Sequence, residues 1–480
     1  MTNDENTSEN IYTNPEDKTQ LINQGGYGCV YYPALRCNPC VCDGKNCKCK
    51  TRFPKDKFVS KIQVLDNNNN EFRISKIIAS ITNFEHYFSP IVNVCKVDLN
   101  RFDKDQVDTY GDKCGVMIKK HHKQFVMVHI PYIHNGNFAK AISKKKSVGS
   151  FNFLINSYKH LLQSINLLLH NNIVHYDLKA ENILYDWKKK CPIIIDFGLS
   201  LNLKDILNKL NIIDGQTVIG IKKSSKAFNK TKYKKGIITS HIRRNLTNFF
   251  YVFAPDYYLW CLEIIFICFL LHGNDSSDNF SIEYSQFKDG TYILTYADVE
   301  NICNKYINSN KALKGFSTGF IQSYIDTAIK YYNKYVGKDS DEIIFDLLQS
   351  WYTWDLYSIN IMYLKLFYYT FETKTNKTLH FLYSLMLLGI HPDPKRRKLP
   401  DEMTIQLHNL YYQNDTVKDL MILMDNNLTT DTASIGDKIK SDDVTIKSIE
   451  RSMVTTGRFD KKTGKKTGSE KITKFNIDLK

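Results

Sequence analysis

The chain has 480 residues, 42% of them hydrophobic, with 30 Tyr and 27 Phe. This length predicts two or three domains, and this hydrophobic content excludes a chain that is disordered throughout. The net charge of +15, from 65 Lys and Arg against 50 Asp and Glu, is compatible with a contact surface for nucleic acid or another anionic surface. Because Lys, Asn, Ile and Tyr are all abundant, compositional drift explains much of the same charge.

The start of the chain and its most apolar stretch bear on location. The first twenty residues are polar and lack the apolar core of a secretion signal. Residues 257–271 are the most apolar stretch, but they are too few to span a bilayer and include Glu263. We therefore expect a buried helix there, no transmembrane segment, and an intracellular, cytoplasmic protein.

The spacing of apolar residues changes along the chain. From Leu21 to about Val128 it is mostly typical of strands, and a helical segment at 71–81 interrupts it. From about residue 150 helices dominate. This order predicts an α+β fold with a small, mostly β lobe, a larger helical lobe and a cleft between them. The expected parts are a disordered tail over 1–17, the β lobe over 18–130, the helical lobe over 131–420 and a polar, basic tail over 421–480.

Two features of the β region suggest phosphate binding. The stretch "INQGGYGCVY" (22–31) is glycine-rich, and glycines let backbone N–H groups approach phosphate oxygens, although a glycine-rich hairpin turn explains it equally well. "FVSKI" places Lys61 inside an apolar strand, either at an edge facing solvent or directed into the cleft. Glu71 opens the helix ten residues later and can hold Lys61 in place.

Residues 171–200 hold most of the chemical information. Phosphoryl transfer needs Mg²⁺ on the phosphates, a cation, and an acceptor for the proton of the substrate hydroxyl. Mg²⁺ takes one or two oxygen ligands from protein, which Asn182 and Asp196 can supply. Asp177 is then the proton acceptor, and Lys179 neutralises charge on the moving phosphoryl group.

The ordered motifs "NQGGYGCV", "VSKI", "HYDLKAEN", "DFG" and "APD" (254–256) resemble those of the eukaryotic-type protein kinase family. "DLYSIN" (355–360) and "HPDPKRRK" (391–398) resemble two later motifs, so the resemblance covers about residues 20–410. It implies a bilobal fold, ATP and Mg²⁺ as cofactors, and protein substrates. Lys179 and "AEN" resemble the Ser/Thr branch. The residues within these motifs resemble those of divergent kinases of large DNA viruses, which would place the protein in host cytoplasm or a virion.

The resemblance also implies which residues contact the nucleotide. Ile130 would be the gatekeeper before the hinge, although the register could slip by one. The implied contacts are Asn23, Gly25, Gly26, Gly28, Val30, Lys61, Glu71, Pro131 and Ile133.

Several positions depart from the family pattern. Tyr176 replaces an Arg that pairs with a phosphorylated activation-segment residue, so we expect loss of one form of control and not of catalysis. Asp256 replaces the Glu of A-P-E and is expected to pair with Arg397. Ser75 falls where an apolar residue is expected, and Asn23 replaces the first glycine of the loop.

Two segments are long for the family. The activation segment, 196–256, is expanded and contains the Lys-rich run 222–235, a candidate contact for nucleic acid or an anionic surface. A helical insertion over about 272–350 is expected to pack on the large lobe, and substrate docking is its alternative role.

Five cysteines lie within thirteen residues, in an insert over 37–49 of the β lobe. In an intracellular protein they favour free thiols or a metal over disulfides. Their spacing can close a tetrahedral Zn²⁺ site, or they can simply accumulate in a surface loop. Cys29, outside this group, is expected to pack. The five are Cys37, Cys40, Cys42, Cys47 and Cys49.

We therefore predict a Mg²⁺-dependent Ser/Thr protein kinase that uses ATP. One alternative is a pseudokinase, a nucleotide-binding scaffold without turnover, whose usual mark is loss of Lys61, Asp177 or Asp196; all three are present. The other is a small-molecule or lipid kinase, against which the motifs of a peptide-docking large lobe argue.

Overall fold

A computed structural model describes residues 20–24, 28–35, 55–65, 70–97, 114–115, 124–134, 138, 141, 150–210, 234–273, 282–371 and 377–412. They fall into two compact units. The first comprises the described residues up to His134 together with Ile195–Gly198, and the second comprises the rest.

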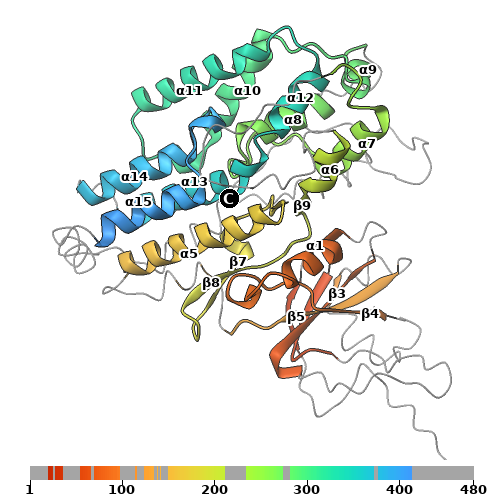
Figure 1. Cartoon of the computed structure of the whole chain (residues 1–480), viewed down its shortest axis with the longest axis vertical. Helices are drawn as coiled ribbons and strands as arrows, with labels where there is room; N and C mark the ends of the chain where they lie inside the picture. The colour runs from red at the N-terminus through yellow and green to blue at the C-terminus, as the bar shows by residue number, and fades with distance from the viewer. Residues whose placement is uncertain are drawn as a thin grey trace, which may run out of the picture. The chain divides into compact units, whose positions relative to one another are not determined.

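The first unit is built on a five-stranded antiparallel sheet of strand order β1-β2-β3-β5-β4 (Figure 1). Besides the strands, its fully described elements include one α-helix and two short 3₁₀ turns, at Lys55–Lys57 and Phe84–His86. The elements are β1 (Gln20–Gln24), β2 (Gly28–Tyr32), β3 (Phe58–Val64), α1 (Asn70–Ala79), β4 (Asn93–Val97) and β5 (Phe125–Pro131).

Strand alternation gives this sheet two different faces. Ile62 and Met127 join a buried cluster on one face that also contains Cys29 and Tyr31. Val126 and Val128 lie on the opposite face, where Phe72 of α1 packs against them. Lys61 pairs with Val128 in the β3–β5 register and with Val30 in the β2–β3 register, so it lies on the face that α1 covers.

The second unit is mainly helical, with two small two-stranded sheets. The strands are β6 (Ile173–Val174) paired with β9 (Leu201–Asn202), and β7 (Ile183–Asp186) paired with β8 (Cys191–Ile194). The helices are α5 (Ser150–His170), α6 (Leu203–Lys209), α7 (Ser240–Phe249), α8 (Leu262–His272), α9 (Ile282–Asp289), α10 (Tyr296–Ser309), α11 (Thr318–Tyr332), α12 (Ser340–Leu348), α13 (Trp354–Phe371), α14 (Lys377–Gly389) and α15 (Pro400–Tyr412).

Helix α8 is at the centre of the second unit's core. Every residue from Leu262 to Leu271 is buried. The buried helix expected over 257–271 is therefore present, but it begins only at Leu262. Within the described part of the chain, no helix is both long and apolar enough to cross a membrane.

The predicted α+β class is confirmed by a β-sheet unit and a larger helical unit. Several expectations fall outside the described residues: the two tails, Gly25 and Gly26, the five-cysteine group, and the Lys-rich run except for its last two residues. The expected boundaries of the lobes and of the insertion remain predictions.

Candidate active site

A buried carboxylate from α13 shapes the loop that carries Asp177. Asp355 is 2% exposed, and its Oδ2 and Oδ1 accept hydrogen bonds from the backbone N–H groups of His175 (2.6 Å) and Tyr176 (3.1 Å). Burial raises the pKa of Asp355 above its usual value. Tyr176 has φ of 70°, which is uncommon for a residue with a side chain, and these two bonds hold it there.

Three neighbours surround the carboxylate of Asp177. Lys179 Nζ lies 2.9 Å from both Oδ1 and Oδ2. Asn182 Nδ2 donates to Oδ2 at 2.9 Å and to the backbone oxygen of Asp177 at 2.7 Å. The hydroxyl of Tyr257, which sequence reasoning missed, donates to Oδ1 at 2.8 Å. All four side chains are buried, so this carboxylate is held in a defined orientation.

The orientation of Asn182 suits a metal ligand. The amide nitrogen of Asn182 donates its hydrogen bonds to Asp177. Because the carboxamide group is planar, the Asn182 side-chain oxygen points away from that nitrogen. An amide oxygen is one of the ligands that Mg²⁺ accepts. Asn182 therefore fits the expected role in metal binding.

Lys61 and Glu71 form an ion pair within the first unit. Lys61 Nζ lies 3.6 Å from Glu71 Oε1, and Gln63 donates to Glu71 Oε2 at 3.2 Å. Ser75, one turn along α1, is 1% exposed and its hydroxyl accepts the backbone N–H of Ile91 at 3.1 Å. This hydrogen bond explains how a polar residue is accommodated at a buried position.

The segment Ile195–Gly198 belongs to the first unit and brings Asp196 towards this pair. A Cβ on Gly198 would lie 3.2 Å from Asp196 Oδ1 and 3.9 Å from Glu71 Oε2. Asp196 has φ of 62°, and its Oδ1 accepts the N–H of Gly198 at 3.3 Å. Phe197 packs edge-on against Phe88 at 6.1 Å. A left-handed aspartate is the kind of backbone outlier that gathers at functional sites.

A model of the protein kinase domain matches residues 17–209, the part of the chain that contains Lys61, Asp177 and Asp196. This part of the chain is therefore similar to protein kinase domains.

Among solved structures, the chain is similar to PK-1 of the Cydia pomonella granulovirus, a kinase, with 23% sequence identity and a TM-score of 0.22. The alignment covers 38% of this chain and 52% of that one, so it spans about half the length of PK-1. No curated protein sequence matches the chain.

The pairing expected for Asp256 is wrong. Arg397 Nη2 lies 2.9 Å from Oε1 of Glu263, and both side chains are at most 1% exposed. Arg397 also donates to Thr353 Oγ1 at 2.9 Å. Asp256 is exposed. Glu263, in "CLE", is therefore the carboxylate that pairs with Arg397.

Aromatic packing fills the surroundings of Tyr176. Its ring is 2% exposed and contacts those of Trp260 (centroids 4.8 Å apart) and Phe250 (5.7 Å). Trp260 Nε1 also donates to the Tyr176 carbonyl at 2.8 Å. Burial raises the pKa of Tyr176 well above its usual value, so the ring stays neutral.

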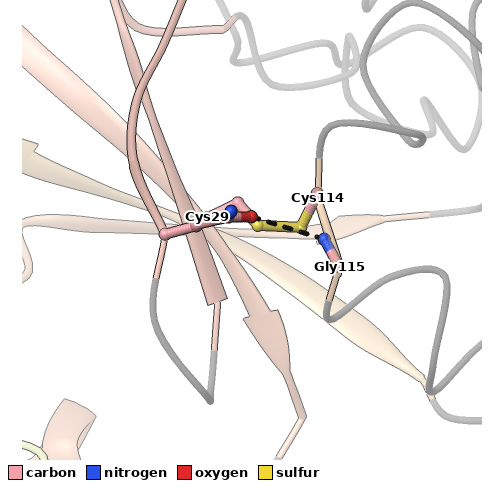
Figure 2. Close-up of a disulfide and its surroundings, with 4 residues drawn as sticks. Cys29, Cys114 and Gly115 are labelled. Atoms are coloured by element: carbon pink, nitrogen blue, oxygen red, sulfur yellow. Dashed lines mark hydrogen bonds between the residues drawn. A yellow bond between two sulfur atoms is a disulfide. The ribbon is translucent and has the colours of Figure 1, made fainter.

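The strand that follows the glycine-rich stretch of the sequence is fixed by a disulfide. Cys29 of β2, next to Gly28, is joined to Cys114, and both are fully buried (Figure 2). The Gly115 N–H lies 3.5 Å from Oε1 of Gln24, the residue of β1 that pairs with Cys29. Cys29 packs, as expected, but the disulfide was not foreseen. Gly28 has no space for a side chain, because a Cβ would lie 2.4 Å from the Ile62 carbonyl oxygen.

The expected hinge lies at the end of β5. The Pro131 carbonyl accepts the Ser89 hydroxyl at 2.9 Å, and a carbonyl oxygen can accept a second bond. Ile130 pairs with Val59 of β3, and Ile133 is buried. Contacts of Pro131 and Ile133 with adenine remain predictions, as do those of Asn23 and Val30 with the nucleotide.

Proposed function

We propose that this kinase transfers the γ-phosphoryl group of ATP to Ser and Thr hydroxyls of proteins in a Mg²⁺-dependent reaction. The observation that carries the proposal is the buried carboxylate of Asp177, held at 2.9 Å by both Lys179 and Asn182. The spacing of Lys179 and Asn182 after Asp177 supports the Ser/Thr branch of the family.

Each residue has a task in the transfer. The acceptor hydroxyl donates its proton to Asp177 as its oxygen bonds to phosphorus and the bond from phosphorus to the β-phosphate oxygen breaks. Lys179, beside Asp177, offsets negative charge on the moving group. Lys61 contacts the phosphates while Glu71 fixes its direction. Asn182 and Asp196 would hold Mg²⁺, which when bound neutralises charge on the phosphates.

Transfer of label from γ-labelled ATP to a mixed panel of proteins tests the proposal. We expect label on Ser and Thr, and its loss by a factor of about 100 or more in Asp177→Asn, which cannot accept the proton. Asp196→Ala should lose activity because it removes a metal ligand. Equal transfer of label by wild type, Asp177→Asn and Asp196→Ala would contradict the assignment. Label on Tyr alone would reject the Ser/Thr class.

The same experiment separates the alternatives. A pseudokinase would bind ATP in a fluorescence titration without labelling any protein. A small-molecule or lipid kinase would leave the panel unlabelled but label a metabolite or lipid extract. The zinc site and the nucleic-acid contact stay separate predictions, checked by metal analysis after dialysis and by retention on DNA or RNA at rising salt concentration.

A further inference from the structure

The activation segment of this kinase needs an anchor that does not depend on phosphate. A phosphorylated residue in this segment would pair with an arginine at position 176, and a buried tyrosine ring occupies that position instead. The segment nevertheless carries Tyr257 onto Asp177 and Trp260 onto Tyr176, so its place decides the geometry of the site. Another contact must therefore hold it.

Arg243 makes such a contact. It lies on α7, within the activation segment, and is only 4% exposed. Its Nε donates to the Phe287 carbonyl at 3.1 Å, and its Nη2 donates to the Leu270 carbonyl at 2.7 Å. Its Nη1 forms an ion pair with Asp341. A guanidinium with donors in a rigid fork can make all these bonds at once, which a lysine cannot.

The partners of Arg243 come largely from the inserted helices. Phe287 belongs to α9 and Asp341 to the first turn of α12, both within the expected insertion. The site around them is closely built. A Cβ on Gly290, which has φ of +81°, would lie 2.5 Å from Asp341 Oδ2, and one on Gly273 would lie 2.8 Å from the Phe287 ring. Larger residues at these two glycines would displace the groups that bind Arg243.

The other end of α7 reaches the catalytic loop. Phe250 follows directly after α7, and its ring packs edge-on against those of Tyr176 (5.7 Å) and Trp354 (5.8 Å). Its carbonyl accepts a hydrogen bond from the ring of His272, at the end of α8. Helix α7 therefore connects two sets of contacts. Arg243, near its start, binds α9 and α12, and Phe250, just after its end, packs against Tyr176.

We propose that the inserted helices α9 and α12, through Arg243 and Asp341, hold the activation segment in its working position in place of a phosphorylated residue. Arg243 and Asp341 are then positioning residues for the transfer, and the kinase is active without phosphate on this segment. The inference rests on the proposed function and gives the insertion a role in it.

Steady-state kinetics of Asp341→Asn test this inference, because the substitution keeps the shape of the side chain and removes its charge. Glu342→Gln is the matched control: it lies on the same helix and pairs with Lys338, but it is partly exposed. We expect Asp341→Asn to lower kcat/KM for the protein substrate at least about tenfold while KM for ATP stays unchanged, since a displaced segment disturbs the acceptor and not the nucleotide. Glu342→Gln should match wild type, and phosphatase treatment should leave wild-type activity intact.

Three results would overturn the inference. One is a kcat/KM for Asp341→Asn equal to that of Glu342→Gln, even with a lower melting temperature, since the pair would then only stabilise the fold. Another is loss of wild-type activity on dephosphorylation of residues 196–263. If wild type has no activity, the proposed function fails, and limited proteolysis then tests the contact between Arg243 and Asp341 by itself. Faster cleavage of Asp341→Asn than of Glu342→Gln within residues 234–263 would support this contact as the anchor of the segment. Equal cleavage of the two variants is the third result that would overturn the inference.

Discussion

Arg397 and Glu263 form a fully buried ion pair between the segment before α15 and the first turn of α8. Glu263→Gln would leave the charge of Arg397 buried without a carboxylate partner. This substitution should therefore lower the free energy of unfolding by about 3–5 kcal/mol. Denaturant titration followed by circular dichroism measures this change. Asp256→Asn is the control and should stay within about 0.5 kcal/mol of wild type, as expected of an exposed position. A large loss in Asp256→Asn with none in Glu263→Gln would restore the sequence-based pairing.

The pairing of Arg397 with Glu263 could not be predicted by matching motifs. "APD" shares its first two residues with the family motif A-P-E, whereas "CLE" shares only the final Glu. Residue identity therefore favoured Asp256 as the partner of Arg397. A physical signal pointed the other way: Glu263 stands alone in an apolar run, and a buried carboxylate requires a cation. The run was recognised as a buried helix, but its need for a partner was not followed to Arg397.

Other parts of the site follow directly from local sequence. Strand alternation places Lys61 on the face that α1 covers, which makes its pairing with Glu71 predictable. Asp177, Lys179 and Asn182 are so close in sequence that one loop and one short turn bring them together. Long-range partners could not be predicted in this way. Tyr257 is 80 residues from Asp177, and no motif spacing links them.

The hydrogen bond from Tyr257 to Asp177 should affect turnover. Tyr257→Phe keeps the ring against Trp260 but removes the donor to Oδ1, so Asp177 loses one of the groups that orient it. We expect kcat to fall about tenfold with little change in KM for ATP. Tyr363→Phe is the control, because the Tyr363 hydroxyl is also buried and has no hydrogen-bond partner among the described residues. A rise in kcat for Tyr257→Phe would instead show that Tyr257 competes with the substrate hydroxyl.

The Cys29–Cys114 disulfide closes a long loop within the first unit. The two residues are 85 positions apart, and a loop of this size corresponds to about 4.5 kcal/mol of stabilisation through the unfolded state. Cys114→Ser should therefore lower the melting temperature and, because Cys29 follows Gly28, raise KM for ATP. Reductant should lower the melting temperature of wild type by more than that of Cys114→Ser, in which only other disulfides, such as that of Cys95, remain to be reduced. Cys191→Ser, which alters a free cysteine, is the control. Equal melting of wild type with and without reductant would contradict the prediction.

Sequence reasoning missed this disulfide because it inferred the state of the cysteines from an expected intracellular location. That inference is statistical, whereas the pairing depends on which strands meet. The register places Cys29 beside Gln24, and the Gly115 N–H approaches the Gln24 side chain. Only the folded sheet brings residue 114 to this position.

The Asp341 carboxyl gives stability a defined pH dependence. Burial raises its pKa to about 6 from the ordinary value of 3.8, although Arg243 beside it acts in the opposite direction and Asp339 adds to the rise. Between these values the folded protein holds a proton that the unfolded chain has released, so this group's contribution to stability falls as pH rises from about 4 to above 6. The free energy of unfolding of wild type minus that of Asp341→Asn should therefore decrease over this range, which denaturant titrations at several pH values can measure. Glu342→Gln should show no such difference in slope from wild type. A difference that increases with pH would mean that the ion pair with Arg243 outweighs burial and keeps the pKa of Asp341 below 3.8.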